Sequence, residues 1–187
     1  MTCSTQRTDR RPARGWLALV GVMFGAAALA AVDLRVTPIT TDGHVFASVA
    51  APSAYTADLR EEVQSGLAVT LTFTIDLKRP SSVWFDHTVT TTTVASSVKF
   101  DNLTRQYQVS KLSDGRVVWS QRTEKEDEMR AWATAFERVP LSDGEVLEPN
   151  AEYYVRVRLR TSSHRSFFLW PWGHDDADGR ADFTYIR

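Results

Sequence analysis

Residues 67–78, with the sequence LAVTLTFTIDLK, contain the most regular alternation of apolar and polar side chains in the chain. This two-residue period is that of a β-strand. The apolar positions are Leu67, Val69, Leu71, Phe73, Ile75 and Leu77. The positions between them are mainly threonine, with Asp76 and Lys78 near the end, and Pro80 follows. The stretch therefore predicts a strand that covers a core with one face and exposes the other to water.

Similar patterns recur along most of the chain. The predicted strands lie at residues 33–39, 43–50, 67–78, 82–102, in both arms of a hairpin at 103–121, and at 152–163 and 180–187. Residues 82–102 are read as one long or bulged strand. Asp-Gly pairs mark the turns of two hairpins, at Asp42-Gly43 and Asp114-Gly115.

Two segments instead carry helix signals. Residues 53–66 predict a short helix, with Ser53 or Thr56 as the N-cap and Gly66 at the C-terminal end. Residues 123–140 predict a longer helix, with Thr123 as its N-cap and Pro140 at its end. Acidic residues in its first turn interact favourably with the helix dipole. Its apolar stripe comprises Met129, Trp132, Ala133 and Phe136. Seven or eight antiparallel strands with one short and one longer inserted helix predict a mainly β, sandwich-like domain over residues 32–187.

Residues 1–31 have the pattern of an export leader. Four arginines, at positions 7, 10, 11 and 14, precede an uncharged apolar run from Gly15 to Val32. Ala28 and Ala30 supply the small residues that a signal peptidase needs. Because the run is near the lower length limit for spanning a bilayer, a retained signal anchor is the alternative to a cleaved signal peptide, and we favour cleavage. We expect a periplasmic domain, or one anchored in the inner membrane on its periplasmic side.

Charge and cysteine content fit this location. The only cysteine, Cys3, lies in the leader, so residues 32–187 cannot form a disulfide. Without the four arginines and one aspartate of the leader, the formal net charge falls from −1 to −4. A mildly acidic domain has no general electrostatic attraction to nucleic acid, and we expect no such partner.

Residues for catalysis or metal binding are sparse. The histidines, at positions 44, 87, 164 and 174, lack the spacing of a metal pair, and no nucleophile elbow or phosphate-binding loop is present. Residues 174–182, HDDADGRAD, superficially resemble a calcium loop but lack its closing glutamate, and we interpret them as an Asp-Gly turn. We therefore predict no catalytic residue, no metal site and no cofactor.

Two other features are candidates for interaction. Arg156, Arg158 and Arg160 alternate on the polar side of a predicted strand, where they either bind an acidic partner or pair with acids on a neighbouring strand. The aromatic stretch FFLWPWG, residues 167–173, contains Trp170 and Trp172. It either closes one end of the sandwich or presents an apolar lip to a partner or membrane.

The order of these segments resembles the domain-of-unknown-function 4390 family of exported bacterial proteins, over most of residues 33–160. The resemblance rests on Arg79, Pro80, Trp84, Asp86, Leu103, Thr104, Arg105, Tyr107, Tyr154, Arg156 and Arg158 in that order. It implies a β-rich domain behind a signal segment, and it carries over no catalytic residue. Residues 167–187 match the family less well.

Arg105 stands out within this pattern. In the stretch DNLTRQYQVS, residues 101–110, alternation places Leu103, Tyr107 and Val109 on the core side, and Arg105 falls on the same side. A buried guanidinium needs partners, so the sequence predicts a structural arginine bonded to Asp86 or to a turn carbonyl. The alternative is an arginine that binds a ligand.

These features predict an exported, non-catalytic module that binds a protein or another component of the cell envelope. A membrane-tethered accessory or sensor domain, acting beside another membrane protein, is the second hypothesis. An enzyme is the third, because no residue pattern supports one.

Overall fold

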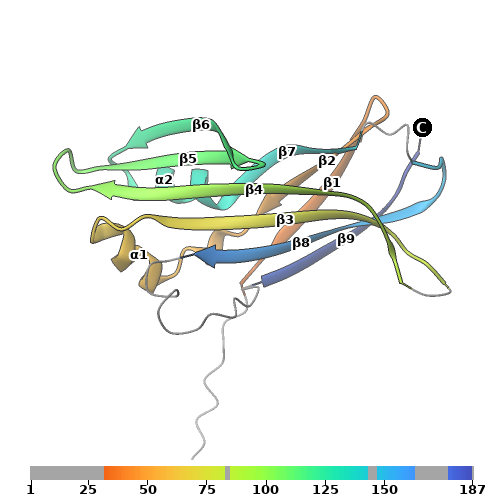
Figure 1. The fold of residues 1–187 in the computed structure, drawn as a ribbon, viewed down its shortest axis with the longest axis horizontal. Helices are drawn as coiled ribbons and strands as arrows, with labels where there is room; N and C mark the ends of the chain where they lie inside the picture. Colours follow the sequence, from red (N-terminus) through yellow and green to blue (C-terminus); the bar gives the residue numbers. More distant parts are fainter. Residues whose placement is uncertain (1–31, 83–84, 143–146, 163–176, 187) are drawn as a thin grey trace, which may run out of the picture. The chain divides into compact units, whose positions relative to one another are not determined.

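The computed structural model describes residues 32–82, 85–142, 147–162 and 177–186. The predicted leader and the aromatic stretch with Trp170 and Trp172 lie outside these residues. Within them the chain forms nine strands in two antiparallel sheets, two α-helices and one short 3-10 helix (Figure 1). The prediction of a mainly β domain with two helices is thus confirmed. No helix in the described part of the chain has the length and apolar character needed to cross a bilayer.

The smaller sheet has the strand order β1-β2-β7. It consists of β1 (Arg35–Thr41), β2 (His44–Ala50) and β7 (Ala135–Ser142). Asp42 and Gly43 join β1 to β2 with φ values of 51° and 77°. Positive φ at both central residues of a two-residue loop matches the twist of the flanking strands, as the Asp-Gly pair predicted.

The larger sheet has the order β6-β5-β4-β3-β8-β9. Its strands are β3 (Val69–Arg79), β4 (His87–Asp101), β5 (Gln106–Ser113), β6 (Arg116–Thr123), β8 (Glu152–Ser162) and β9 (Ala177–Thr184). β3 lies in the interior of the sheet, between β4 and β8, and buries the apolar residues that its alternation identified, from Val69 onward. Leu67 precedes the strand and is exposed.

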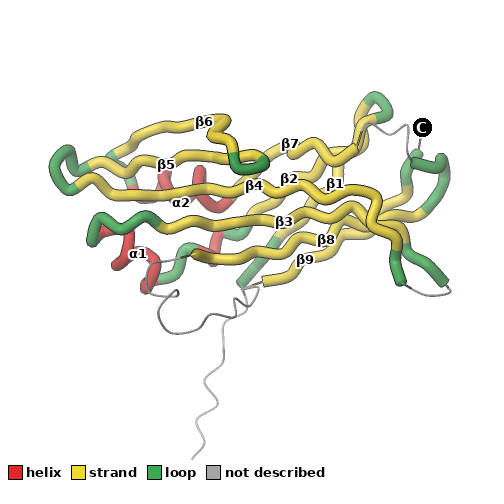
Figure 2. Tube along the Cα trace, viewed as in Figure 1, coloured by secondary structure: helices red, strands yellow, loops and turns green. Residues whose placement is uncertain are grey.

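One face of the larger sheet is covered and the other is not. Helix α2 (Glu126–Thr134) and the smaller sheet pack on the same side (Figure 2), and α1 (Ala57–Gln64) closes the end at which β3 begins. Phe73 of β3 meets Phe136 of β7 edge to face, with 5.4 Å between ring centroids. Trp119 of β6 meets Trp132 of α2 in the same way. These contacts join both sheets and α2 in one core.

The first helix agrees with its prediction. After a 3-10 turn at Pro52–Ala54, the Thr56 hydroxyl accepts a hydrogen bond from the amide of Leu59 and caps α1. Gly66 follows the helix with φ +87°.

The second helix is shorter than predicted. It ends at Thr134, and Phe136 and Pro140 lie in β7 rather than in the helix. Phe136, Val139 and Leu141 are buried, so packing in the sheet overrides the helical spacing. β7 is an edge strand, where a proline is tolerated. Lys125 is the N-cap instead of Thr123, whose hydroxyl accepts from the Lys125 amide and donates to Glu128.

Two other predictions about local structure are wrong. Asp178 and Gly179 are part of β9 and do not form a turn. Gly179 suits this position because a Cβ there would lie 3.0 Å from the side chain of Leu34 and 3.1 Å from that of Val36. The strand predicted from residue 82 begins only at His87. The bulge that was expected in this strand is present, as a register shift opposite Leu77 and Lys78.

Candidate functional site

The uncovered face of the larger sheet gathers the charged residues that the sequence singled out. We call it the open face. In its two central strands it consists of Thr70, Thr72, Thr74, Asp76 and Lys78 of β3, with Tyr154, Arg156, Arg158, Arg160 and Ser162 of β8. On β9, Asp178, Arg180 and Asp182 continue it. Strand register thus brings all three predicted arginines of β8 onto one surface.

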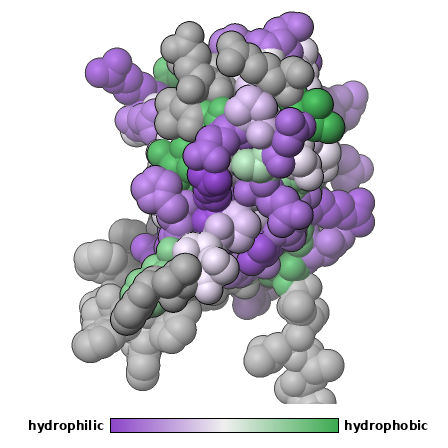
Figure 3. Space-filling view, turned by 90° about the vertical axis from the view of Figure 1, so that its right-hand side faces the viewer, coloured by the Kyte–Doolittle hydropathy of each residue, from purple (hydrophilic) through white to green (hydrophobic). Residues whose placement is uncertain are grey.

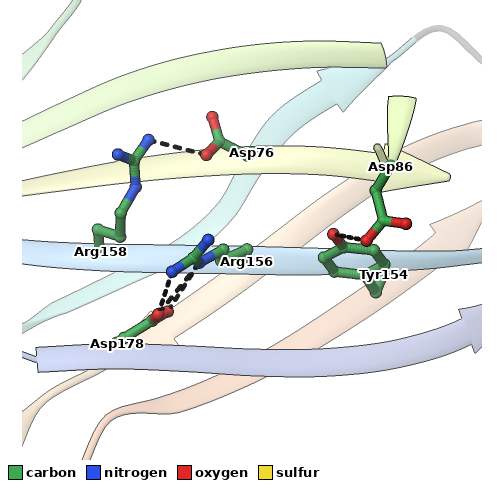
Figure 4. A network of polar contacts seen from close by, with 6 residues as sticks. All are labelled: Asp76, Asp86, Tyr154, Arg156, Arg158 and Asp178. Carbon is green, nitrogen blue, oxygen red and sulfur yellow. Dashed lines mark hydrogen bonds and ion pairs between the residues drawn. The ribbon is translucent and has the colours of Figure 1, made fainter. Parts of the chain in front are cut away.

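Asp76 is the buried charged residue of this surface. It is only 5% exposed, although the alternation of β3 places it on the open face. Arg158 donates from Nη2 to Asp76 Oδ2 at 2.9 Å (Figure 4). The Thr91 hydroxyl donates to Asp76 Oδ1 at 2.7 Å. The aliphatic part of an arginine can cover a neighbour while its guanidinium reaches water. Arg158 therefore both neutralises and shields the carboxylate.

Arg156 pairs in the opposite direction, with Asp178 on β9. Its Nη2 donates to Asp178 Oδ2 at 2.5 Å, and its Nε contacts both carboxylate oxygens at 3.1 and 3.2 Å. This carboxylate raises the pKa of Arg156 further above its usual range. For Arg156 and Arg158 the prediction of pairing with acids on neighbouring strands is confirmed. Arg160 is exposed, next to Thr72 in the register.

A second network surrounds Tyr154. Its hydroxyl donates to Asp86 Oδ2 at 2.6 Å, and Asp86 Oδ1 accepts from the Ser81 amide at 3.0 Å. Arg180 lies over the Tyr154 ring, 3.8 Å from its centroid, and also bonds Asp182. The hydrogen bond from Tyr154, followed by that from Ser81, holds the pKa of Asp86 below its usual range. Figure 3 views this end of the sheets and shows mostly hydrophilic residues, with single hydrophobic ones between them.

The Asp86 pair should make stability depend on pH. Because the folded-state pKa of Asp86 is depressed, its contribution is complete above the unfolded value of about 3.9 and is lost as the pH falls through the folded value. Tyr154→Phe removes the donor and keeps the ring under Arg180. We expect the variant to be less stable than the parent at pH 7, with a difference that shrinks below about pH 4. Urea unfolding at several pH values measures it, and a difference independent of pH would contradict this role.

Arg105 lies elsewhere and is not buried. It belongs to the turn that joins β4 to β5, has φ 56°, and is exposed. The turn also carries Leu103, which is 95% exposed, so the prediction that both face the core is wrong. The Asp101 carboxylate accepts from the amides of Leu103 and Thr104 and ends the strand alternation there. Asp86, one of the two partners predicted for Arg105, bonds Tyr154 and Ser81 instead.

Arg105→Ala is accordingly expected to change the free energy of unfolding by less than about 0.5 kcal/mol. Arg105→Gly should stabilise the protein by up to about 1 kcal/mol, because glycine adopts a positive φ without steric cost. Chemical unfolding of the purified variants measures both values. A large loss on the alanine change would restore the structural role that the sequence predicted.

Part of this network of charged residues could be identified from the sequence. Asp86, Tyr154, Arg156 and Arg158 all belong to the residues that carry the family resemblance. Asp178 was missed because Asp-Gly indicated a turn, and the buried Asp76 was missed because alternation placed it in water. In the described residues no three histidine, cysteine or acidic side chains are grouped as metal ligands.

Comparisons with known proteins add a family and no established activity. No curated protein and no solved structure matches the chain. The model of one family, described as domain of unknown function (DUF4390), matches residues 28–165. This range includes β1 to β8. It also includes the residues of both networks described above, with the exception of those on β9, such as Asp178 and Arg180. The chain therefore belongs to the DUF4390 family.

Proposed function

We propose that this chain is an exported, non-catalytic binding module of the cell envelope, and that the open face is its binding surface. The observation that carries the proposal is the pair of arginines on β8. Each is held by an acidic partner while about two fifths of its side chain stays in water, 43% for Arg156 and 37% for Arg158. Such fixed guanidinium groups lose little conformational entropy on binding an acidic or polar surface.

Location is the second part of the proposal. The basic residues and apolar run of positions 1–31 support export across the inner membrane into the periplasm. A cytoplasm-active reporter fused after Arg187 should be silent in cells, and strong activity would overturn export. The intact mass of the exported protein distinguishes a cleaved leader from a retained one.

A membrane-tethered accessory domain, acting beside another membrane protein, is the second candidate. The apolar run from Gly15 to Val32 supports it, because a run near the lower length limit for spanning a bilayer can still anchor a domain when it is retained. Retention of the run in the mature protein would support this version. Both versions use the same open face and differ only in whether the domain diffuses freely.

Site-specific crosslinking in intact cells tests the binding surface. A photoreactive residue replaces Thr74, on the open face, or Thr37, an exposed threonine on β1 of the other sheet. We expect defined adducts with an envelope component from position 74 and none from position 37. Adducts from position 37 alone, or from neither position, would overturn the assignment of the open face.

A further inference from the structure

A row of hydroxyl groups crosses five strands of the open face. Strand register aligns one serine or threonine from each of β8, β3, β4, β5 and β6. The row consists of Ser162, Thr70, Ser97, Ser110 and Ser120. With about 4.8 Å between neighbouring strands, it is about 19 Å long. Within the described residues, Ser110 and Ser120 bond each other at 3.0 Å, whereas the Thr70 and Ser97 hydroxyls have no hydrogen-bond partner.

The row runs beside a hollow at the same end of the sheet. Lys99 lies two residues after Ser97, and Gln108 lies two residues before Ser110, so both are on the same face in the next position along their antiparallel strands. The hollow has a volume of about 390 Å³ and is lined by Ser65, Gly66, Lys99, Phe100, Asp101, Asn102 and Gln108. Its wall comes from the turn after β4 and from the end of α1.

Local structure fixes the shape of this hollow. Asp101 accepts hydrogen bonds from the Leu103 and Thr104 amides at 2.9 and 3.3 Å, which hold the pKa of its carboxyl below its usual range and order the turn. Asn102 packs over Gly66, where a Cβ would lie 2.9 Å from the Asn102 amide nitrogen. Any residue larger than glycine at position 66 would displace that amide.

The lining indicates what kind of molecule fits. Lys99 and Asp101 are the two charged residues of the lining and carry opposite charges, so the lining itself has no net charge. Asn102 and Gln108 offer both donors and acceptors. The ring of Phe100 lies on the covered face of the strand, against Tyr107, so the hollow is mainly polar. A ligand with many hydroxyl groups and no net charge satisfies such a set of groups, because each hydroxyl both donates and accepts. The adjacent hydroxyl row repeats at about the length that one sugar unit adds to an extended chain.

We propose that this end of the open face binds a neutral saccharide chain, with one sugar in the hollow and the following sugars along the hydroxyl row. This names a ligand class for the surface assigned above and rests on that binding role. Lys99 and Asp101 bind hydroxyl groups of the first sugar, and Asn102 and Gln108 bind its polar substituents. The hydroxyl row then adds contacts in proportion to chain length.

Calorimetric titration of the purified full-length protein tests the proposal. The probes are N-acetylglucosamine and its β-linked dimer and tetramer. Glucuronate is the acidic sugar for comparison. We expect millimolar binding of the single sugar, roughly tenfold tighter binding of the tetramer, and weaker binding of glucuronate. No binding of the tetramer, or tighter binding of glucuronate than of the neutral sugar, would overturn the proposal.

Variants separate the two parts of the site. Gln108→Ala should weaken the binding of every probe, and Ser97→Ala should weaken the binding of the tetramer only. Thr37→Ala, on the other sheet, should leave the binding of all probes unchanged. Unchanged tetramer binding in both Gln108→Ala and Ser97→Ala would contradict the assigned position. Because the replaced side chains are exposed or half-exposed, we expect the variants to fold normally, and thermal melts check this. Crosslinking from position 74 without sugar binding would reject the saccharide and leave the proposed function standing.

Discussion

Arg158→Ala is expected to lower the free energy of unfolding by about 3 kcal/mol, as measured by urea unfolding at pH 7. The variant leaves the Asp76 carboxylate, which is 5% exposed, with the Thr91 hydroxyl as its remaining partner. A buried charge without its counter-ion costs far more than the pair contributes when it is intact. For a domain of ordinary stability this is a large part of the total.

Arg156→Ala is the matched control. It removes the same side chain, one alternation away on the same strand, but its partner Asp178 is almost half exposed and is rehydrated when the arginine is lost. We expect a loss below about 1 kcal/mol. Adding Asp76→Asn to Arg158→Ala should recover about 1 kcal/mol of the free energy of unfolding, because it removes the buried charge that has lost its counter-ion. Equal losses for the two arginines would refute the distinction between a buried and an exposed pair.

Phe73→Ala should be the most destabilising of the apolar changes, at about 3–5 kcal/mol. The ring is completely buried in β3 and packs edge to face on Phe136 of the smaller sheet. Its loss removes apolar contact and leaves a cavity between two sheets that cannot both move inward to fill it. Thermal and urea unfolding both measure the effect.

Phe85→Ala provides the comparison for this change. Phe85 is 89% exposed, so the same substitution there should alter stability by no more than about 0.5 kcal/mol. The aggregation of partly unfolded Phe73→Ala would be a further sign that the two sheets had separated. A Phe73→Ala variant as stable as Phe85→Ala would mean that the sheets are not packed through this contact.

The strands could be predicted from sequence because their signals are local. The alternation of residues 67–78 reports burial one residue at a time, and Asp42-Gly43 and Asp114-Gly115 suit hairpin turns with φ above zero at both positions. Neither signal depends on which strands become neighbours. The sequence therefore predicted the elements of the fold, while the order of strands in the two sheets came only from the structure.

The errors arose where distant contacts decide the local conformation. Phe136 fits the stripe of a helix and the inner face of a strand equally well, and packing against Phe73 selects the strand. Arg105 belongs to a turn that Asp101 stabilises, and this turn interrupts the strand although the apolar and polar residues still alternate in the sequence. Asp178 became part of the site only because β9 pairs with β8.

The strand order also determines when the domain can fold. β3 pairs with β4, its neighbour in the chain, but its other edge waits for β8, as Phe73 opposite Leu159 illustrates. The smaller sheet likewise joins β2 to a strand from the second half of the chain. Contacts between segments so far apart in sequence slow folding, because the chain loses loop entropy before the contacts form. The edge of β3 that pairs with β8 is thus unpaired until residues 152–162 join it, and an unpaired strand edge makes a folding intermediate prone to aggregation.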